Sequence, residues 1–324
     1  MRRNMQSGRD SGQDREPAVP QPQHDARWYV RARRRFARLD ATLKGLLWSA
    51  AAGFIFSQLN ALMRVLSMEL DPFQTQFLRY LFGCMVMLPL VLKSGLAVYW
   101  PKSIGAQFTR GLVHCVGLWM WFAALPHVPL ADMTAMGFSG PIFIMIGATL
   151  FFREPMRWDR WLAALIGFAG VLIVVAPKLS GAGAYFHLVM LASSPVFAAS
   201  FLLTKMLTRN ESAGVIVVWQ GISVALFSLP PALLHWQPVS ALQWLGFVLC
   251  GTLGSAGHYC LTRSIHVADI SSTQSVRFLD LIWASFLGWL WFADVPTLSA
   301  ISGGAVIALS TLWIARREAR ATRG

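Results

Sequence analysis

The chain has 324 residues, of which 55% are hydrophobic and only 13% are charged, whereas soluble domains carry about 25% charged residues. This composition excludes an ordinary soluble globular protein. The net charge of +13 does not indicate nucleic-acid binding, because ten arginines lie in the first 38 residues and most others flank apolar runs. Basic residues beside apolar runs are typical topology signals of membrane proteins.

The N-terminal segment 1–41 is polar and Arg-rich, contains three prolines and lacks the apolar core of a secretion signal. We expect a basic, largely disordered cytoplasmic tail there. Residues 28–36 (WYVRARRRF) could form a helix on the membrane surface, or simply provide the charged flank of the first span. A second basic cytoplasmic tail is expected at 317–324.

Continuously apolar runs of the length that crosses a bilayer as a helix recur along the rest of the chain. The predicted fold is therefore an all-α polytopic membrane protein with ten transmembrane helices. The predicted spans are 45–63, 74–92, 107–125, 132–151, 161–176, 185–204, 213–231, 243–262, 271–291 and 298–315.

The distribution of Lys and Arg tests this assignment. Of the 28 basic residues, Arg64 and Lys178 fall on one side, and Arg79 and Arg277 fall within spans. All the others, Arg110 included, fall on the side of both termini. This asymmetry predicts a multi-pass protein of the cytoplasmic (inner) membrane with both termini in the cytoplasm.

A weak internal repeat divides the spans into two groups of five, over 42–177 and 178–316. The segment HVPLADMTAMGFSGP, which leads to FFREP, parallels HVADISSTQSVRFLD, which leads to WFADVP. Because five is an odd number of spans, two copies must have opposite orientations in the membrane. Inverted repeats are typical of secondary transporters, which bind their solute near the midplane where the repeats meet.

These features resemble the drug/metabolite transporter superfamily, in its EamA-like ten-helix branch. The matching residues are Arg79 in FLRY, Pro141 and Glu154 around the fourth span, and Gly167 and Gly170 in the fifth. The resemblance covers about 42–316, and the pairing of FLRY with RFLDL is similar to carriers of riboflavin and S-adenosylmethionine. Asp280 stands where the first repeat has Pro141, and Asp294-Val295-Pro296 replaces the usual acidic-Pro pair.

Polar residues within the spans are the candidate solute or coupling site, because ionisable groups in hydrocarbon are costly unless a cavity or partner receives them. Asp280 is expected at mid-span, one turn after Arg277, and the two could line a cavity or form a purely structural ion pair. Arg79 could face the cavity or extend to the headgroups. The other candidates are Asn60, His114, Gln220 and His258, with Trp121 and Tyr259 as stacking groups; packing is the alternative for each.

The remaining candidates are structural. Pro141 is expected to kink the fourth span, and the glycines Gly167 and Gly170 to permit close helix packing. Cys84, Cys115, Cys250 and Cys260 lie in apolar runs without metal-ligand spacing, so we expect neither a metal nor a cofactor.

The predicted function is secondary transport of a small metabolite by alternating access, driven by the solute gradient, exchange or protons. The solute could be planar, zwitterionic or cationic; membrane lipid is the expected surrounding, and homodimerisation is left open. The alternative is an intramembrane enzyme acting on a lipid-linked substrate, although no HExxH, GxSxG or P-loop motif is present and no catalytic residue is predicted.

Overall fold

A computed structural model describes residues 39–153, 158–179, 181, 183–268, 273 and 276–321. The chain divides into two units, Met1–Leu39 and Asp40–Gly324. The first unit, with the predicted tail and surface helix, lies outside the described residues except for Leu39, as does Glu154. The following description concerns the second unit alone.

The described residues of this unit form helices and connectors, with no β-strand. The α-helices are α2 (Ala41–Glu69), α3 (Pro72–Ser94), α4 (Ile104–Ala124), α5 (Leu130–Gly137), α6 (Gly140–Phe152), α7 (Trp158–Val175), α8 (Ala184–Leu207), α9 (Ala213–Leu234), α10 (Ala241–Val267), α12 (Phe278–Phe292) and α13 (Leu298–Ala321). Short 3₁₀ helices occupy Leu96–Tyr99, Leu125–His127 and Ala176–Lys178.

Seven helices of the described chain are long and apolar enough to cross a membrane, and two shorter apolar helices cover Leu279–Phe292 and Leu298–Trp313. Each of the ten predicted spans overlaps a helix or, at 132–151, a pair of helices. The helical class predicted from the sequence is therefore confirmed.

Local sequence signals explain where several helices begin. The side chain of Asp71 accepts hydrogen bonds from the backbone N–H groups of Phe73 (2.9 Å) and Gln74 (3.3 Å). Pro72, which has no N–H to satisfy, occupies the first turn of the same helix, α3. Ser240 and Gln243 form a capping box at the start of α10.

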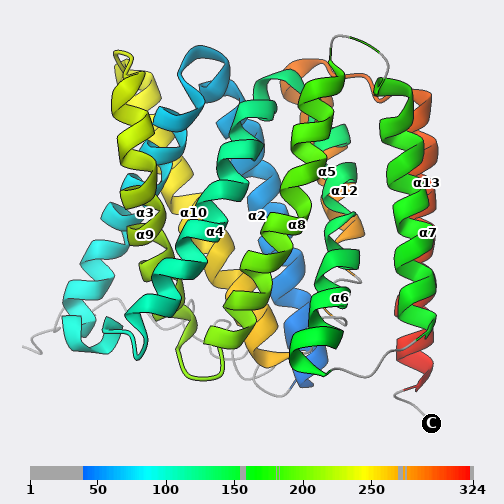
Figure 1. Cartoon of the computed structure of the whole chain (residues 1–324), viewed down its shortest axis with the longest axis horizontal. Coiled ribbons are helices and arrows are strands. Elements are labelled where there is room, and N and C mark those ends of the chain that lie inside the picture. Colours follow the sequence, from blue (N-terminus) through cyan, green and yellow to red (C-terminus); the bar gives the residue numbers. More distant parts are fainter. Residues whose placement is uncertain are drawn as a thin grey trace, which may run out of the picture. The chain divides into compact units, whose positions relative to one another are not determined.

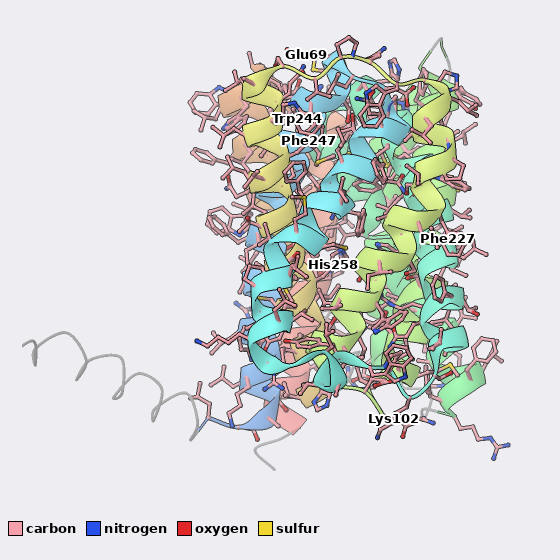
Figure 2. The ribbon with its side chains drawn as sticks, turned by 90° about the vertical axis from the view of Figure 1, so that its left-hand side faces the viewer. Glu69, Lys102, Phe227, Trp244, Phe247 and His258 are labelled. Atoms are coloured by element: carbon pink, nitrogen blue, oxygen red, sulfur yellow. The ribbon has the colours of Figure 1, made fainter. Side chains whose placement is uncertain are left out.

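Figure 1 shows the helices running roughly parallel or antiparallel to one another. The terminal end of this bundle is defined here as the end where α2 begins and α13 finishes, and the distal end as the end where α2 finishes. Side by side lie α2 with α10 and α12, α8 with α4 and α6, α3 with α9, and α7 with α13. In a view turned by 90°, Glu69 lies at the distal end, Lys102 at the terminal end and His258 between them (Figure 2).

Two predicted spans differ from the continuous helices expected. The span 132–151 is broken at Phe138 and Ser139, so that Pro141 occupies the first turn of α6 rather than kinking a continuous helix. Pro141 fits there because the first N–H groups of a helix have no partner within it. Similarly, α12 begins at Phe278, which places Asp280 in its first turn instead of at mid-helix.

Two arginines assigned to connectors are instead buried within helices, so that part of the charge count was wrong. Arg64 lies in α2 and is 8% exposed, and Arg110 lies in α4 and is 4% exposed. Each therefore needs a polar partner or a cavity rather than lipid headgroups. Their different partners are described below.

Glycines allow α7 and α13 to approach closely. A Cβ atom on Gly170 would lie 2.7 Å from the carbonyl oxygen of Gly303, and one on Gly303 would lie 2.5 Å from that of Gly170. In the same contact, a Cβ atom on Gly167 would lie 3.3 Å from Oγ of Ser310. Small residues thus bring two backbones together, as in many membrane helix pairs.

Candidate functional site

A cavity of about 270 Å³ lies between helices from both halves of the chain. Its lining comes from the central part of α2, most of α4, the second half of α8, the late part of α10, the beginning of α6 and α12, and from α3 and α5. The predicted site residues that line it are Asn60, Arg79, His114, Trp121, His258, Arg277 and Asp280. The structure therefore brings seven of the nine candidates together.

The two other candidates lie elsewhere. Gln220 is buried in α9 and reaches the site indirectly, because its amide nitrogen lies 3.2 Å from Nε2 of His258. Tyr259 is 39% exposed and its ring meets the edge of Trp48, on a face of α10 that lines neither of the two cavities described here. The adjacent positions 258 and 259 differ by about 100° around a helix, so only one of them can face the cavity.

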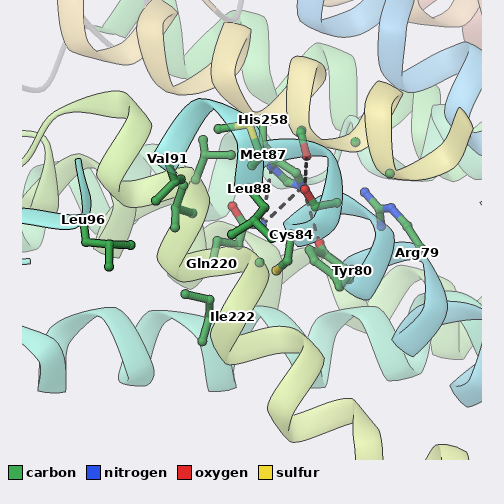
Figure 3. Close-up of a pocket in the computed structure, with 17 residues that line it drawn as sticks. Arg79, Tyr80, Cys84, Met87, Leu88, Val91, Leu96, Gln220, Ile222 and His258 are labelled. Carbon is green, nitrogen blue, oxygen red and sulfur yellow. Dashed lines mark hydrogen bonds between the residues drawn. The ribbon is translucent and has the colours of Figure 1, made fainter. Parts of the chain in front are cut away.

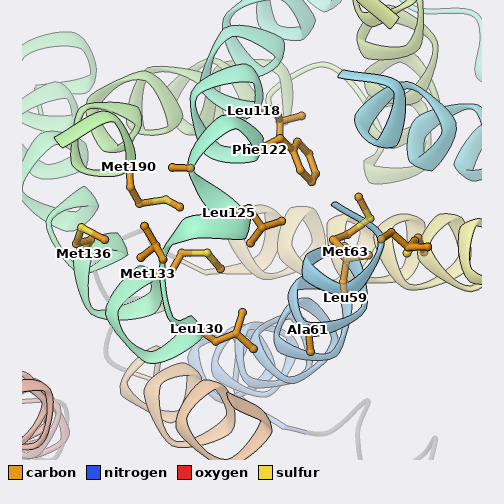
Figure 4. Packing of buried hydrophobic residues seen from close by; sticks show 14 of the residues in the cluster. Leu59, Ala61, Met63, Leu118, Phe122, Leu125, Leu130, Met133, Met136 and Met190 are labelled. Atoms are coloured by element: carbon orange, nitrogen blue, oxygen red, sulfur yellow. The ribbon is translucent and has the colours of Figure 1, made fainter. Parts of the chain in front are cut away.

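The cavity is closed toward the distal end by packed apolar side chains. Figure 4 shows part of this cluster, in which Leu59 and Met63 of α2 approach Leu118 and Phe122 of α4. The cluster continues through Leu125, Leu130, Met133, Met136 and Met190, all at most 1% exposed. Leu118 and Met133 of this cluster also form part of the cavity lining.

Ion pairs reinforce the same distal end. Nη1 of Arg64 donates to Oδ2 of Asp294 at 2.5 Å, and the guanidinium also lies over the ring of Phe292 at 4.2 Å. A second group joins Lys178 to Asp132 of α5, with His187 of α8 at 3.9 Å from the same carboxylate. These pairs tie together segments from both halves of the chain.

A chain of polar contacts crosses the cavity wall from α8 to α10. Arg110 donates from Nε to Oγ1 of Thr204 at 2.5 Å and from Nη2 to Oε1 of Gln220 at 2.8 Å. The amide nitrogen of Gln220 then approaches His258. All the partners of this guanidinium that the structure describes are neutral.

The chain of contacts continues from His258 back to α8. The hydroxyl of Tyr80 lies 3.4 Å from Nε2 of His258 and 3.1 Å from Nε2 of His114. Nδ1 of His114 lies 3.1 Å from the hydroxyl of Ser200. Both histidines thus hold one another in place through Tyr80, a residue that the sequence analysis did not select.

Arg277 and Asp280 form the ion pair expected from their spacing, with Nε 3.3 Å from Oδ2. The side chain of Asp280 is 14% exposed and that of Arg277 is 38% exposed. Across the cavity, Asp280 lies directly against Gly53 of α2, where a Cβ atom would overlap its carboxylate. Gly53 therefore leaves the space that the carboxylate occupies.

A second cavity of about 250 Å³ lies between α3, α9 and α10. Arg79 and His258 line both cavities, so the second one meets the first at these two side chains. Figure 3 shows this second cavity, with Arg79 and Tyr80 on the right, Gln220 and His258 in the middle beside Met87 and Leu88, and the apolar side chains of Val91 and Leu96 on the left. Its apolar part suits hydrocarbon or a ring better than a charged group.

The sequence model of the EamA-like transporter family matches the chain twice, over residues 43–176 and 185–316. The chain belongs to the EamA-like transporter family. It is thus a multi-pass membrane protein of the drug/metabolite transporter superfamily, and the resemblance drawn from the sequence motifs is confirmed.

Named relatives of this EamA-like protein are transporters. It is 32% identical over 282 residues to the riboflavin transporter of Rhizobium johnstonii, and this alignment covers 86% of this chain and 93% of the relative. It is 26% identical over 283 residues to the S-adenosylmethionine uptake transporter of Rickettsia felis, with 87% and 96% covered. The pseudopaline exporter of Pseudomonas aeruginosa is 24% identical over 284 residues, with 86% and 99% covered.

One solved crystal structure supports the fold of this EamA-like protein. That chain is 18% identical and aligns with a TM-score of 0.65, over 84% of this chain and 98% of its own length. The family description and the names of the relatives point to transport rather than enzymatic activity.

Arg110 is a charged residue of the cavity lining that the sequence analysis did not select. It lies at the seventh position of α4, close enough to the basic connector before it to be taken for a topology signal. The available signal was its position inside the predicted span 107–125, where a charged residue is costly and marks a cavity or a pair.

Proposed function

We propose that this EamA-like protein is a secondary transporter that moves a small metabolite across the cytoplasmic membrane by alternating access. The observation that carries the proposal is the cavity with its buried polar side chains, bounded toward the distal end by packed apolar side chains and ion pairs. A solute bound beside Arg79, His114 and His258 could reach one side of the membrane and not the other. Opening of the distal end together with closure of the terminal end would then release the solute on the other side of the membrane.

The proposed architecture is two inverted five-helix repeats, 42–177 and 178–316. The helix pairing supports it, because α2 contacts α10 and α12 in the way that α8 contacts α4 and α6. In each case, the first helix of one half contacts the helices of the third and fourth spans of the other half. The pairs α3 with α9 and α7 with α13 join equivalent helices of the two halves.

The proposed orientation places both termini in the cytoplasm, so that the terminal end faces inward. The basic connectors support it, since Lys93, Lys102 and Arg209 lie toward the terminal end. The described conformation would then be inward-facing, with its distal layer closing the outer side. Solute gradient, exchange or protons could drive the cycle.

Riboflavin and S-adenosylmethionine are the first solutes to test, because relatives are named as their transporters. The purified protein would be placed in liposomes preloaded with one unlabelled solute, and entry of the same labelled solute would be measured. Preloading should accelerate entry, since an alternating carrier exchanges solute without net flux. Entry no faster than into protein-free liposomes, with or without preloading, for both solutes and for other metabolites from a panel would contradict the proposed function.

A further inference from the structure

Two buried guanidinium groups face the cavity without a negatively charged partner among the described residues. Arg79 is 6% exposed and makes neither an ion pair nor a hydrogen bond there; its Nε atom is buried and unpartnered. Arg110 is 4% exposed, and its Nη1 atom is also buried and unpartnered. Such N–H groups are costly to leave without an acceptor.

The charge of the cavity is also unbalanced. Among the described residues, its charged lining consists of Arg79, Arg110, Arg277 and Asp280, and the ion pair of Arg277 with Asp280 accounts for one positive and one negative charge. Two positive charges remain, both in surroundings of low dielectric where they are poorly solvated. The arrangement attracts a negative group more strongly than a neutral one.

A third feature adds to this positive potential. The helix α6 begins at Gly140, which lines the cavity, and its first turn contains no acidic residue. The N-terminal end of a helix carries a partial positive charge and unpaired N–H groups. By contrast, the corresponding end of α12 has Asp280 in its first turn.

We propose that Arg79 and Arg110 form an anion-binding subsite that receives the carboxylate or phosphate group of a small organic solute. The inference rests on the proposed transport function and specifies the class of solute at the same cavity. Arg110 is prepared for this role by Thr204 and Gln220, which orient two of its nitrogen atoms and leave Nη1 free. Arg79 contributes a guanidinium held over the ring of Tyr80 at 4.7 Å.

Arg64 provides a matched contrast, because it is a similarly buried arginine that has its carboxylate partner. Arg64→Gln removes one half of the pair with Asp294, whereas Arg79→Gln removes a charge that no described carboxylate balances. In thermal unfolding of the purified, solute-free protein, Arg64→Gln should lower the midpoint temperature. Arg79→Gln should leave it unchanged or raise it, as removal of strain at a functional site often does.

Binding is tested with two pairs of probes that differ only in the anionic group. Riboflavin 5′-phosphate is compared with riboflavin, and S-adenosylmethionine with its decarboxylated form, on the full-length protein in detergent. We expect the anionic member of at least one pair to bind at least tenfold more tightly, which also distinguishes phosphate from carboxylate. Arg79→Gln and Arg110→Gln should each remove most of that preference, while Arg209→Gln, at an exposed position, should retain it.

Three results would overturn the anion subsite. The first is equal binding of the two members in both pairs of probes. The second is a preference for the anionic member that survives in Arg79→Gln and Arg110→Gln, and the third is a decrease in midpoint temperature in Arg79→Gln as large as that in Arg64→Gln.

Failure of transport is separate from these results. If neutral riboflavin is exchanged without any anion preference, only the subsite is wrong. If no solute is exchanged, the proposed function fails, and the thermal comparison still decides whether Arg79 is structural.

Discussion

The ion pair between Arg64 and Asp294 should hold the distal half closed, and breaking it should favour the alternate conformation. Asp294→Asn removes the negative charge but keeps the shape and one acceptor oxygen. Hydrogen bonds to charged groups contribute about 1.5 to 3 kcal/mol. Because the side chain of Asp294 is 22% exposed, and that of Arg64 10%, we take the lower figure of about 1.5 kcal/mol. This corresponds to a roughly tenfold change in the ratio of distal-open to distal-closed molecules.

The assay is modification of a cysteine in the closed layer by a membrane-impermeant maleimide added outside whole cells. Met136→Cys, at a side chain that is 0% exposed, serves as the reporter after the four native cysteines have been replaced. While the open state is rare, the rate of modification follows its population. Asp294→Asn should therefore increase that rate about tenfold.

The control is Asp159→Asn, which weakens an ion pair with Arg317 at the opposite end of the bundle, where the atoms lie 3.4 Å apart. It should not increase modification from outside. The double variant Arg64→Gln with Asp294→Asn should react about as fast as Asp294→Asn, because both lack the pair. An Asp294→Asn variant that reacts no faster than the Asp159→Asn control would refute the assignment of this pair as a distal closure.

Three further predictions follow from the cavity, the helix contacts and the proposed orientation. Asp280→Asn should abolish or strongly slow exchange in liposomes although the protein still reaches the membrane. Gly53→Ala should do the same, because its Cβ atom would displace the carboxylate of Asp280. Normal exchange in the double variant Arg277→Gln with Asp280→Asn would show that the ion pair is purely structural. Gly170→Ala should lower the thermal unfolding midpoint, because overpacking of this contact should reduce the free energy of unfolding by about 1–3 kcal/mol. The control Gly105→Ala, with nothing within 4 Å of its Cβ atom, should leave the midpoint unchanged. Equal midpoints for the two variants would contradict the close contact of α7 with α13. A cysteine introduced at Gly324 should resist impermeant maleimide in intact cells and react after permeabilisation, so labelling of intact cells would reverse the orientation.

The helical class and the approximate positions of the helices could be predicted because each depends on local composition. A run of apolar residues long enough to cross a bilayer has few alternatives to a helix, since backbone groups in lipid must be satisfied within the segment. The breaks after Gly137 and before Phe278 were not predicted. The apolar run continues through the first break, where Pro141 was interpreted as a kink rather than a helix start, and the polar stretch SSTQSVR at 271–277 was included in the ninth predicted span.

The candidate site was predicted in part, for a related reason. Charged and polar residues inside apolar runs are conspicuous, which identified Arg79, His114 and His258. Tyr80 and Arg110 acquire their roles from helices distant in the sequence, through His114 and His258 in one case and Thr204 and Gln220 in the other. No pattern within α3 or α4 shows which neighbouring helix will supply a partner, so these contacts required the tertiary structure.

The helices α6 and α12 begin in different ways, and this difference bears on Asp280. In the proposed repeat, α6 corresponds to α12, and Pro141 in the first turn of α6 corresponds to Asp280 in the first turn of α12. Proline suits a helix start because it lacks an N–H group, and aspartate suits one because its charge favours the positive end of the helix. Asp280 therefore has a structural reason to be where it is, independent of any solute. That reason does not require Gly53 to leave room for the carboxylate at the cavity wall, so this contact is what favours a role in binding or coupling.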